Sequence, residues 1–299
     1  MKEKYQQSID IAIAYLKKHG RPLDKALYAC LFEGGKIDAV LSEMENFRNS
    51  DGGFGHGYEP DLQCPDSSAL CTTEAMQTCW KLGLEADHPL VKGAVDFFLN
   101  TYQVSAKSWY FVPESAMNHP RAPWWQYDSD AAAYKHNPRP EILGVLWRAK
   151  ESVPAGMLNS LADAVLADFQ ADLAEINMHD LYCYLRLART PNLREDIHNA
   201  LLKELPAIIT KEVKTTEEEW AKYGIRPYAI THDVNDPFYP LVAESMPNAL
   251  NYLLKEQLED GSWPLTWSWG ENYPEVWPKA EKEWKSRVTL DNICLLKEI

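Results

Sequence analysis

An Asp-Gly turn occurs near each end of the chain, and this pair of turns constrains the fold more than any other feature of the sequence. The first reads Asp51-Gly52-Gly53-Phe54-Gly55, and the second reads Asp260-Gly261-Ser262-Trp263-Pro264. Each follows a segment with helical spacing and precedes, after a loop, another such segment. A glycine just past the last helical turn adopts the left-handed conformation that ends a helix at little cost. Two such turns at the two ends predict a ring of helix pairs whose ends meet.

Helical periodicity continues along the chain, and no segment shows the alternation of a β-strand. The short local connections favour helix pairs over a bundle of long helices. The sequence therefore predicts an all-α fold, an α/α toroid of about six helix pairs. No linker or change of composition divides residues 1–299, so we expect one domain. The predicted helices cover roughly residues 4–19, 23–31, 37–47, 67–82, 90–102, 141–151, 155–173, 178–189, 192–210, 246–258 and 278–299.

Two long segments, 103–138 and 215–244, lack a clear helical period and are rich in aromatic residues. Irregular segments of this length are uncommon inside compact domains and are usually functional when they occur. We predict two irregular loops at the rim of the toroid, of which the first could act as a lid. A short hairpin that covers helix ends explains the first segment equally well.

The charge balance excludes some classes of partner. The chain has 30 basic and 44 acidic residues, for a formal net charge of −14. Such a surface repels nucleic-acid backbones and anionic membranes, so we expect no nucleic-acid partner. No apolar run approaches the roughly 20 residues of a membrane span, and the start of the chain lacks the apolar core of a secretion signal. We expect no membrane insertion; the sequence does not determine the oligomeric state.

Six cysteines occur without CxxC spacing, mostly within apolar helical segments. Buried free thiols in a reducing compartment explain this pattern best. The sequence therefore predicts a cytoplasmic protein. The cysteines stand at positions 30, 64, 71, 79, 183 and 294.

The loop after the first Asp-Gly turn holds the densest group of candidate catalytic residues, namely His56, Glu59 and Asp61. A histidine and two carboxylates at this spacing can act as general acid and base, or can hold a cation. Tyr58 lies between them and is a candidate for substrate binding. The plain alternative is a capped, solvated loop.

Two further acidic groups lie in the irregular segments. Asp233 and Asp236 follow His232 in an aromatic setting that includes Tyr228, where an acid could protonate a substrate while rings stabilise a cation or stack on a sugar. Turn formation is the alternative, since Asn235-Asp236-Pro237 is strong turn chemistry.

Asp130 is the remaining catalytic candidate, and four tryptophans are candidates for substrate binding. Trp124 and Trp125 precede Asp130, while Trp267 and Trp269 follow the second Asp-Gly turn. Aromatic rings suit both isoprenoid cations and sugar faces. Packing beneath the loops is the alternative for Trp267 and Trp269.

The two turns resemble the QW-type repeats of the squalene/terpenoid cyclase and protein prenyltransferase superfamily. Gln257 and Trp263 occupy the Gln and Trp positions of the second repeat, whereas the first has Phe54 for Trp and lacks the Gln. The segments 71–75 and 288–290 resemble the inner helix that follows each repeat. The resemblance implies a divergent, single-domain helical toroid in which the repeats are structural.

The functional motifs of that superfamily are mostly missing. No Asp-x-Asp-Asp acid of the cyclases is present, nor the tandem Asp-rich motif that binds diphosphate through magnesium. Asp180-Leu181-Tyr182-Cys183 looks similar to part of the prenyltransferase zinc site but lies among apolar residues. We predict no metal and no cofactor.

Three functions remain open, each with a small-molecule substrate or ligand that is apolar or a sugar. An enzyme that acts on an isoprenoid or similar apolar substrate, favoured by the resemblance, predicts a central aromatic-lined cavity with Asp61 and Asp233 pointing into it. A carbohydrate-active toroid, either hydrolase or lyase, predicts an open cleft with two opposed carboxylates. A non-catalytic toroid that binds a ligand or partner predicts a cavity without clustered titratable groups.

Overall fold

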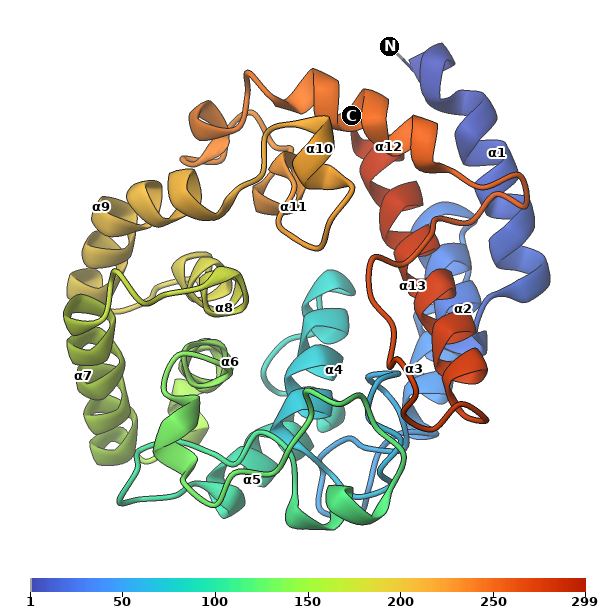
Figure 1. Cartoon of the computed structure of the whole chain (residues 1–299). Coiled ribbons are helices and arrows are strands. Elements are labelled where there is room, and N and C mark those ends of the chain that lie inside the picture. Colours follow the sequence, from blue (N-terminus) through green and yellow to red (C-terminus); the bar gives the residue numbers. More distant parts are fainter. Residues whose placement is uncertain (1) are drawn as a thin grey trace. The chain divides into compact units, whose positions relative to one another are not determined.

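The computed structural model describes residues 2–299, and side chains from residue 5 onward. The described residues form thirteen α-helices and four short 3-10 helices, with no β-strand (Figure 1). The prediction of an all-α fold is confirmed. The chain divides into two compact units, of which one is the continuous segment Phe47–Glu212 and the other combines Met1–Asn46 with Val213–Ile299. We call these the middle unit and the terminal unit.

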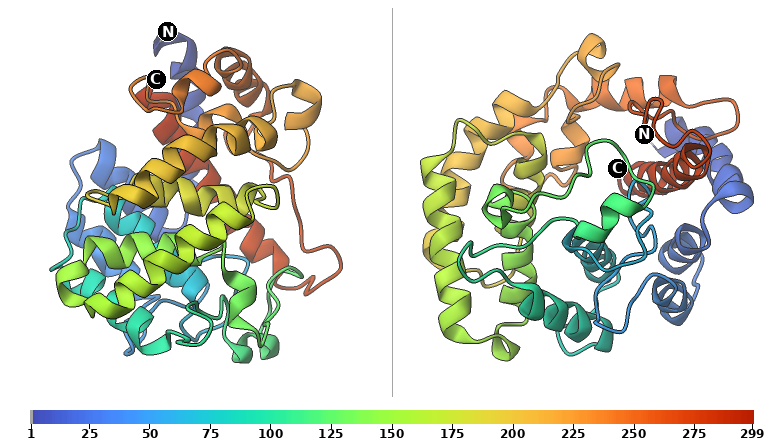
Figure 2. Two further views of the ribbon diagram at one scale, coloured as in Figure 1. Left: turned by 90° about the vertical axis from the view of Figure 1, so that its left-hand side faces the viewer. Right: turned by 60° about the horizontal axis from the view of Figure 1, so that its bottom comes forward.

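The middle unit consists of three consecutive helix pairs. Within it, α6 packs against α7 and α8, and α8 packs against α9. Figures 1 and 2 show α4, α6 and α8 in one layer of this unit and α5, α7 and α9 in a second layer. The pairs are α4 (Ala69–Lys81) with α5 (Pro89–Thr101), α6 (Arg139–Arg148) with α7 (Ala155–Ala171), and α8 (Met178–Ala188) with α9 (Glu195–Glu212), and the 3-10 helices are η1 (Glu114–Asn118), η2 (Ala131–Tyr134) and η3 (Lys150–Ser152).

Side-chain caps fix the starts of two helices in the α4, α6 and α8 layer. The Ser68 hydroxyl accepts a hydrogen bond from the backbone N–H of Cys71 at the start of α4. At the start of α8, Asn177 and Asp180 form a reciprocal capping box. Each cap satisfies backbone donors that the first helical turn leaves without partners.

The terminal unit brings the two ends of the chain together. Its longest helix, α13, packs against α1 and also contacts α2, while α2 packs against α3. The segment that was predicted as a second irregular loop contains three short helices, α10, α11 and η4. The helices of this unit are α1 (Lys2–His19), α2 (Pro22–Phe32), α3 (Ile37–Glu45), α10 (Glu217–Trp220), α11 (Pro227–Ile230), η4 (Tyr239–Leu241), α12 (Met246–Glu256) and α13 (Trp277–Glu298).

A buried polar group joins α13 to the start of α2. The Ser286 hydroxyl donates to Asp24 at 2.6 Å and accepts from the Arg21 backbone N–H at 2.9 Å. The Arg21 guanidinium donates to both carboxylate oxygens of Asp24. All three residues are buried, and their charges are paired, as buried charges require.

The two Asp-Gly turns have the same backbone geometry. Gly52 and Gly261 adopt φ values of 86° and 93°. In each turn the aspartate side chain accepts a hydrogen bond from the backbone N–H two residues later, at 3.0 Å for Asp51 and 2.9 Å for Asp260. The recurrence follows from the shared sequence, because only glycine adopts this conformation without strain.

Each turn is also pressed against a neighbouring helix. A Cβ atom on Gly52 would lie 2.3 Å from the carbonyl oxygen of Gly93 in α5, and one on Gly261 would lie 2.4 Å from that of Ile11 in α1. The glycines are therefore required both for the turn and for the close approach of two backbones.

A third turn of this kind follows α5. Gln103 and Trp109 have the same sequence spacing as Gln257 and Trp263, and Lys107 adopts a φ of 48° where Gly261 stands in the later turn. The Trp109 indole N–H donates to the Phe98 carbonyl at 2.7 Å, as that of Trp263 donates to Leu253 at 2.8 Å. In both cases a tryptophan after the turn folds back onto the preceding helix.

Candidate functional site

The loop that follows the first Asp-Gly turn is held by a segment about 60 residues further along the chain. The Ala122 N–H donates to the Asp61 carbonyl at 2.8 Å, and the Gln63 N–H donates to the Pro120 carbonyl at 3.0 Å. An antiparallel bridge joins Leu62 to Arg121. These contacts lie within the middle unit and fix the position of the candidate acids.

Glu59 and Asp61 are both buried, each with 2 % of its surface exposed. The Trp125 indole N–H lies 3.3 Å from Glu59 Oε1, and the Trp125 ring meets Phe111 edge to face at 5.1 Å. The structure therefore brings together Glu59 and Trp125, two residues that were predicted as separate candidates. A buried carboxyl beside aromatic rings is a typical setting for acid–base chemistry.

The other members of this predicted group lie differently. His56 is exposed, with a φ of 53°, and its Nε2 lies 2.9 Å from the Asn49 side-chain oxygen. Tyr58 is buried, and its hydroxyl donates to Thr78 at 2.8 Å. His56 thus stands at the surface, while Glu59 and Asp61 lie in the interior.

Asp130 and Trp124 lie at the surface of the middle unit. Asp130 caps the 3-10 helix η2, because its carboxylate accepts the Ala132 N–H at 2.9 Å. Trp124 is 44 % exposed. The contacts of Asp130 are those of a helix cap.

The candidate acids of the terminal unit are engaged in turns. Asp233 is exposed, and its Oδ1 accepts from the backbone N–H of Asn235 at 2.8 Å. Asp236 accepts from the backbone N–H of Phe238 at 2.9 Å. These hydrogen bonds are those of the turn that the sequence offered as the alternative.

The aromatic candidates of the terminal unit pack against other residues of that unit. Trp269 is fully buried and tilts against Trp277 at 5.5 Å. Trp267 meets Trp284 edge to face at 5.2 Å. Tyr228 accepts a hydrogen bond from Arg226 at 3.1 Å. Packing thus accounts for much of the surface of both tryptophans.

A polar cluster that was not predicted from the sequence is centred on Glu141, in the first turn of α6. The Gln77 side chain on α4 donates to Glu141 Oε1 at 2.7 Å, and the Arg186 guanidinium on α8 donates to Oε2 at 3.1 Å. Glu141 is 7 % exposed, so its carboxylate is nearly removed from solvent. The signal in the sequence was the occurrence of charged residues at 141 and 186 within otherwise apolar helical segments.

The electrostatics of this cluster follow from burial. Burial raises the pKa of Glu141, and the nearby Glu74 carboxylate adds to the rise, while Arg186 and Gln77 oppose it. The Cys183 thiol lies 3.4 Å from the Asn137 side-chain oxygen, and burial raises its pKa well above its usual value. Cys183 is therefore a neutral thiol near neutral pH and not a nucleophilic thiolate.

Further polar pairs surround the same helices. His136 bridges the Tyr184 hydroxyl, at 2.7 Å, and the Asp172 carboxylate, at 3.0 Å. Arg139, buried to 2 % exposure, pairs with Asp168 on α7. The Arg139–Asp168 pair ties α6 to α7.

The described residues contain no group of three or more His, Cys, Asp or Glu side chains that could hold a metal ion. Asp180 and Cys183, which resembled part of a zinc site, have other contacts. Asp180 closes the capping box of α8, whereas the Cys183 thiol faces Asn137 and Glu141.

Comparisons with family models, curated proteins and solved structures give no match to this chain. A search of the described helices likewise finds none with the length and apolar character needed to cross a membrane.

Proposed function

We propose that this chain is an enzyme that performs acid–base chemistry on a polar small molecule, with Glu141 as the proton-transfer group and a carbohydrate as the substrate class. The observation that carries the proposal is the Glu141 carboxyl, buried between donors from α4 and α8 and with a raised pKa. A carboxyl with a pKa above its usual range exchanges protons closer to neutral pH.

Glu74 gives Glu141 a second carboxylate in its surroundings, on the neighbouring helix α4. Glycoside hydrolysis uses two neighbouring carboxyls, one as acid and the other as base or nucleophile. We assign the role of acid to Glu141 and the role of base or nucleophile to Glu74.

Arg186 supplies recognition. Its side chain is 40 % exposed, and its guanidinium lies 5.7 Å from the centre of the Tyr182 ring. Guanidinium and amide donors bind hydroxyl groups, and an aromatic ring packs against a sugar face. This combination suits a neutral, hydroxyl-rich substrate.

The test is turnover of a panel of oligosaccharides by Glu141→Gln, Glu74→Gln and the matched control Glu151→Gln, an exposed residue of η3. We expect Glu141→Gln to lower the rate by about 10²–10⁴-fold while calorimetry shows that saccharide binding persists. The control is expected to keep full activity. Full activity of Glu141→Gln, or no saccharide binding by the unaltered chain, would reject the proposal.

A second candidate rests on the three recurrent turns, which support membership of the squalene/terpenoid cyclase and protein prenyltransferase superfamily. In that case the helices close into a toroid of about six pairs, the protein is cytoplasmic, and the substrate is an isoprenoid or similar apolar chain. Binding of a farnesyl-type chain in place of oligosaccharides would favour this candidate. Tight binding of either ligand without turnover would instead favour a non-catalytic toroid.

A further inference from the structure

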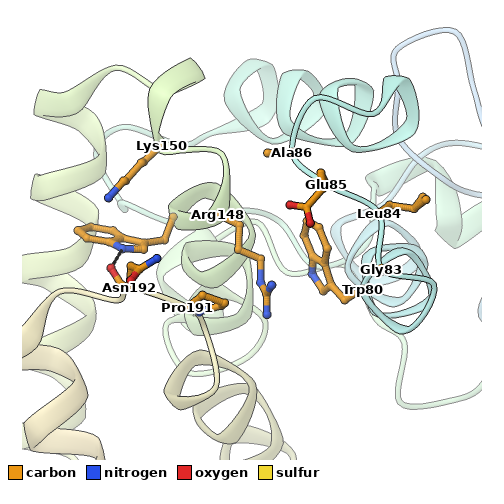
Figure 3. A pocket seen from close by; sticks show the side chains of 10 residues that line it. Trp80, Gly83, Leu84, Glu85, Ala86, Arg148, Lys150, Pro191 and Asn192 are labelled. Carbon is orange, nitrogen blue, oxygen red and sulfur yellow. Dashed lines mark hydrogen bonds between the residues drawn. The ribbon is translucent and has the colours of Figure 1, made fainter.

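A pocket of about 280 Å³ opens in the middle unit, at the end where three helix connections meet. It is lined by the end of α4, the end of α6 with η3, and the turn between α8 and α9 (Figure 3). The residues that define its chemistry are Trp80, Glu85, Trp147, Arg148, Lys150 and Asn192. None of them belongs to the Glu141 cluster.

Arg148 is the central charged group of the pocket. Its guanidinium carbon lies 4.8 Å from the centre of the Trp80 ring, and Figure 3 shows the two side chains next to each other. A guanidinium stacked on an aromatic face still presents its N–H donors at its edge. Among the described residues no acceptor takes a hydrogen bond from the Arg148 side chain, so these donors are available to a ligand.

Lys150 and Trp147 line the other side of the pocket. The Lys150 ammonium lies 6.0 Å from the centre of the Trp147 ring. The Trp147 indole N–H donates to the Asn192 carbonyl at 2.6 Å, which fixes the ring as part of the wall. Asn192 adopts a φ of 52°, a conformation that asparagine tolerates better than most residues.

The charge of the pocket differs in sign from that of the chain. The lining of the pocket holds two cationic side chains and one carboxylate, Glu85, whereas the chain as a whole carries a net charge of −14. Burial lowers the pKa of Arg148, with Glu85 opposing the shift, so an anion beside the guanidinium is further stabilised by a charge that is partly desolvated. Glu85 disfavours ligands with two negative charges.

We propose that this pocket is a binding site for a small organic monoanion, a carboxylate attached to a flat ring. The carboxylate pairs with the edge of the Arg148 guanidinium, and the ring packs against the indole walls. Lys150, on the other side of the pocket, adds a favourable positive charge. The volume fits a molecule of one or two rings and is smaller than typical sites for drug-sized ligands.

Helix ends offer a different reason for these cations. The C-terminal ends of α4 and α6 both lie at the pocket, and Lys or Arg side chains there stabilise helices through the helix dipole. That role requires no ligand and predicts that loss of the charge lowers stability without any change in binding. Binding of the ligand by the charge-removing variants therefore separates the two roles.

The test is calorimetric titration of the full chain with phenylacetate and with its neutral analogue phenylacetamide. We expect a dissociation constant for phenylacetate of about 1 mM or below, and binding of the amide weaker by about tenfold or more. Binding of the carboxylate is expected to weaken as salt is added.

Arg148→Met and Lys150→Met remove one charge each, and Lys92→Met on the exposed surface of α5 is the matched control. Each pocket variant is expected to weaken phenylacetate binding, Arg148→Met by about tenfold or more, while Lys92→Met leaves it unchanged. Lys150 is exposed, so Lys150→Met keeps the test decisive if Arg148→Met fails to fold. Equal binding of the amide and the carboxylate, unchanged binding by both pocket variants, or no binding of phenylacetate at millimolar concentration would overturn the proposal.

Discussion

At the scale of single residues, a glycine can be required for its positive φ alone, as at Gly83, or also for the close approach of a neighbouring backbone, as at Gly52. Both have a positive φ, 71° at Gly83 and 86° at Gly52, but a Cβ on Gly52 would collide with the backbone of Gly93, whereas one on Gly83 would meet nothing within 4 Å. We expect Gly83→Ala to lower the free energy of unfolding by about 1 kcal/mol and Gly52→Ala by about 3 kcal/mol or more. Urea denaturation measures both, and equal losses would show that the turn relaxes away from α5.

Two buried thiols make the free energy of unfolding depend on pH in the alkaline range. Burial raises the pKa of Cys71 and of Cys79 to about 12, from 9.0. Above pH 9 the unfolded chain releases these protons and the folded chain retains them, so the free energy of unfolding falls as pH rises. Each thiol adds to this fall between pH 9 and 12.

Unfolding measured at several pH values between 8.5 and 10.5 tests this contribution. We expect Cys79→Ala to reduce the slope of stability against pH, whatever its effect on stability at neutral pH. The partly exposed Cys30 serves as the comparison, and the reduction in slope should be larger for Cys79→Ala than for Cys30→Ala. An unchanged slope in Cys79→Ala would contradict the predicted shift.

The sequence could identify acidic residues as candidates, but it could not rank them. His56, Glu59 and Asp61 were predicted as one group because they are close in sequence. Their different exposure comes from the pairing of residues 61–63 with residues 120–122, which local spacing does not reveal. Glu141 was missed for the same reason, since its partners Gln77 and Arg186 lie on two other helices.

At the scale of secondary-structure elements, the sequence revealed two of the three turns that recur in the fold. The middle turn has the spacing of Gln257 and Trp263, but Lys107 stands where the others have glycine. A search for Asp-Gly therefore does not find it. The helix starts and ends were predicted to within a few residues, because apolar spacing and caps are local signals.

The tryptophan hydrogen bonds of these turns should contribute measurably to stability. Trp109 and Trp263 are buried, and each indole N–H donates to a helix carbonyl. We expect Trp109→Phe and Trp263→Phe each to lower the free energy of unfolding by about 1–3 kcal/mol, since a buried carbonyl loses its donor. Trp124→Phe, at an exposed position, should change it by less than about 0.5 kcal/mol. Denaturation curves that do not distinguish the three variants would rule out this role.

At the scale of the whole molecule, the all-α class could be predicted from periodicity alone. The division of the chain into two compact units could not. The terminal unit joins residues up to Asn46 with residues from Val213 onward. Pairing between α1 and α13 spans nearly the whole chain, and such long-range packing leaves no mark in a local window. The single domain over residues 1–299 stays a prediction, which the unfolding of separate fragments can test.

The division into units predicts how fragments of the chain behave. Residues 47–212 contain three complete helix pairs with their own buried core, so we expect this fragment to fold alone, with cooperative unfolding followed by circular dichroism. Residues 213–299 should not fold alone, because α13 packs on α1 and α2, which the fragment lacks. Addition of a second fragment, residues 1–46, should restore helical signal to it. If residues 47–212 stay unfolded while the full chain unfolds in one transition, the chain is a single cooperative domain, as a closed ring of helix pairs requires.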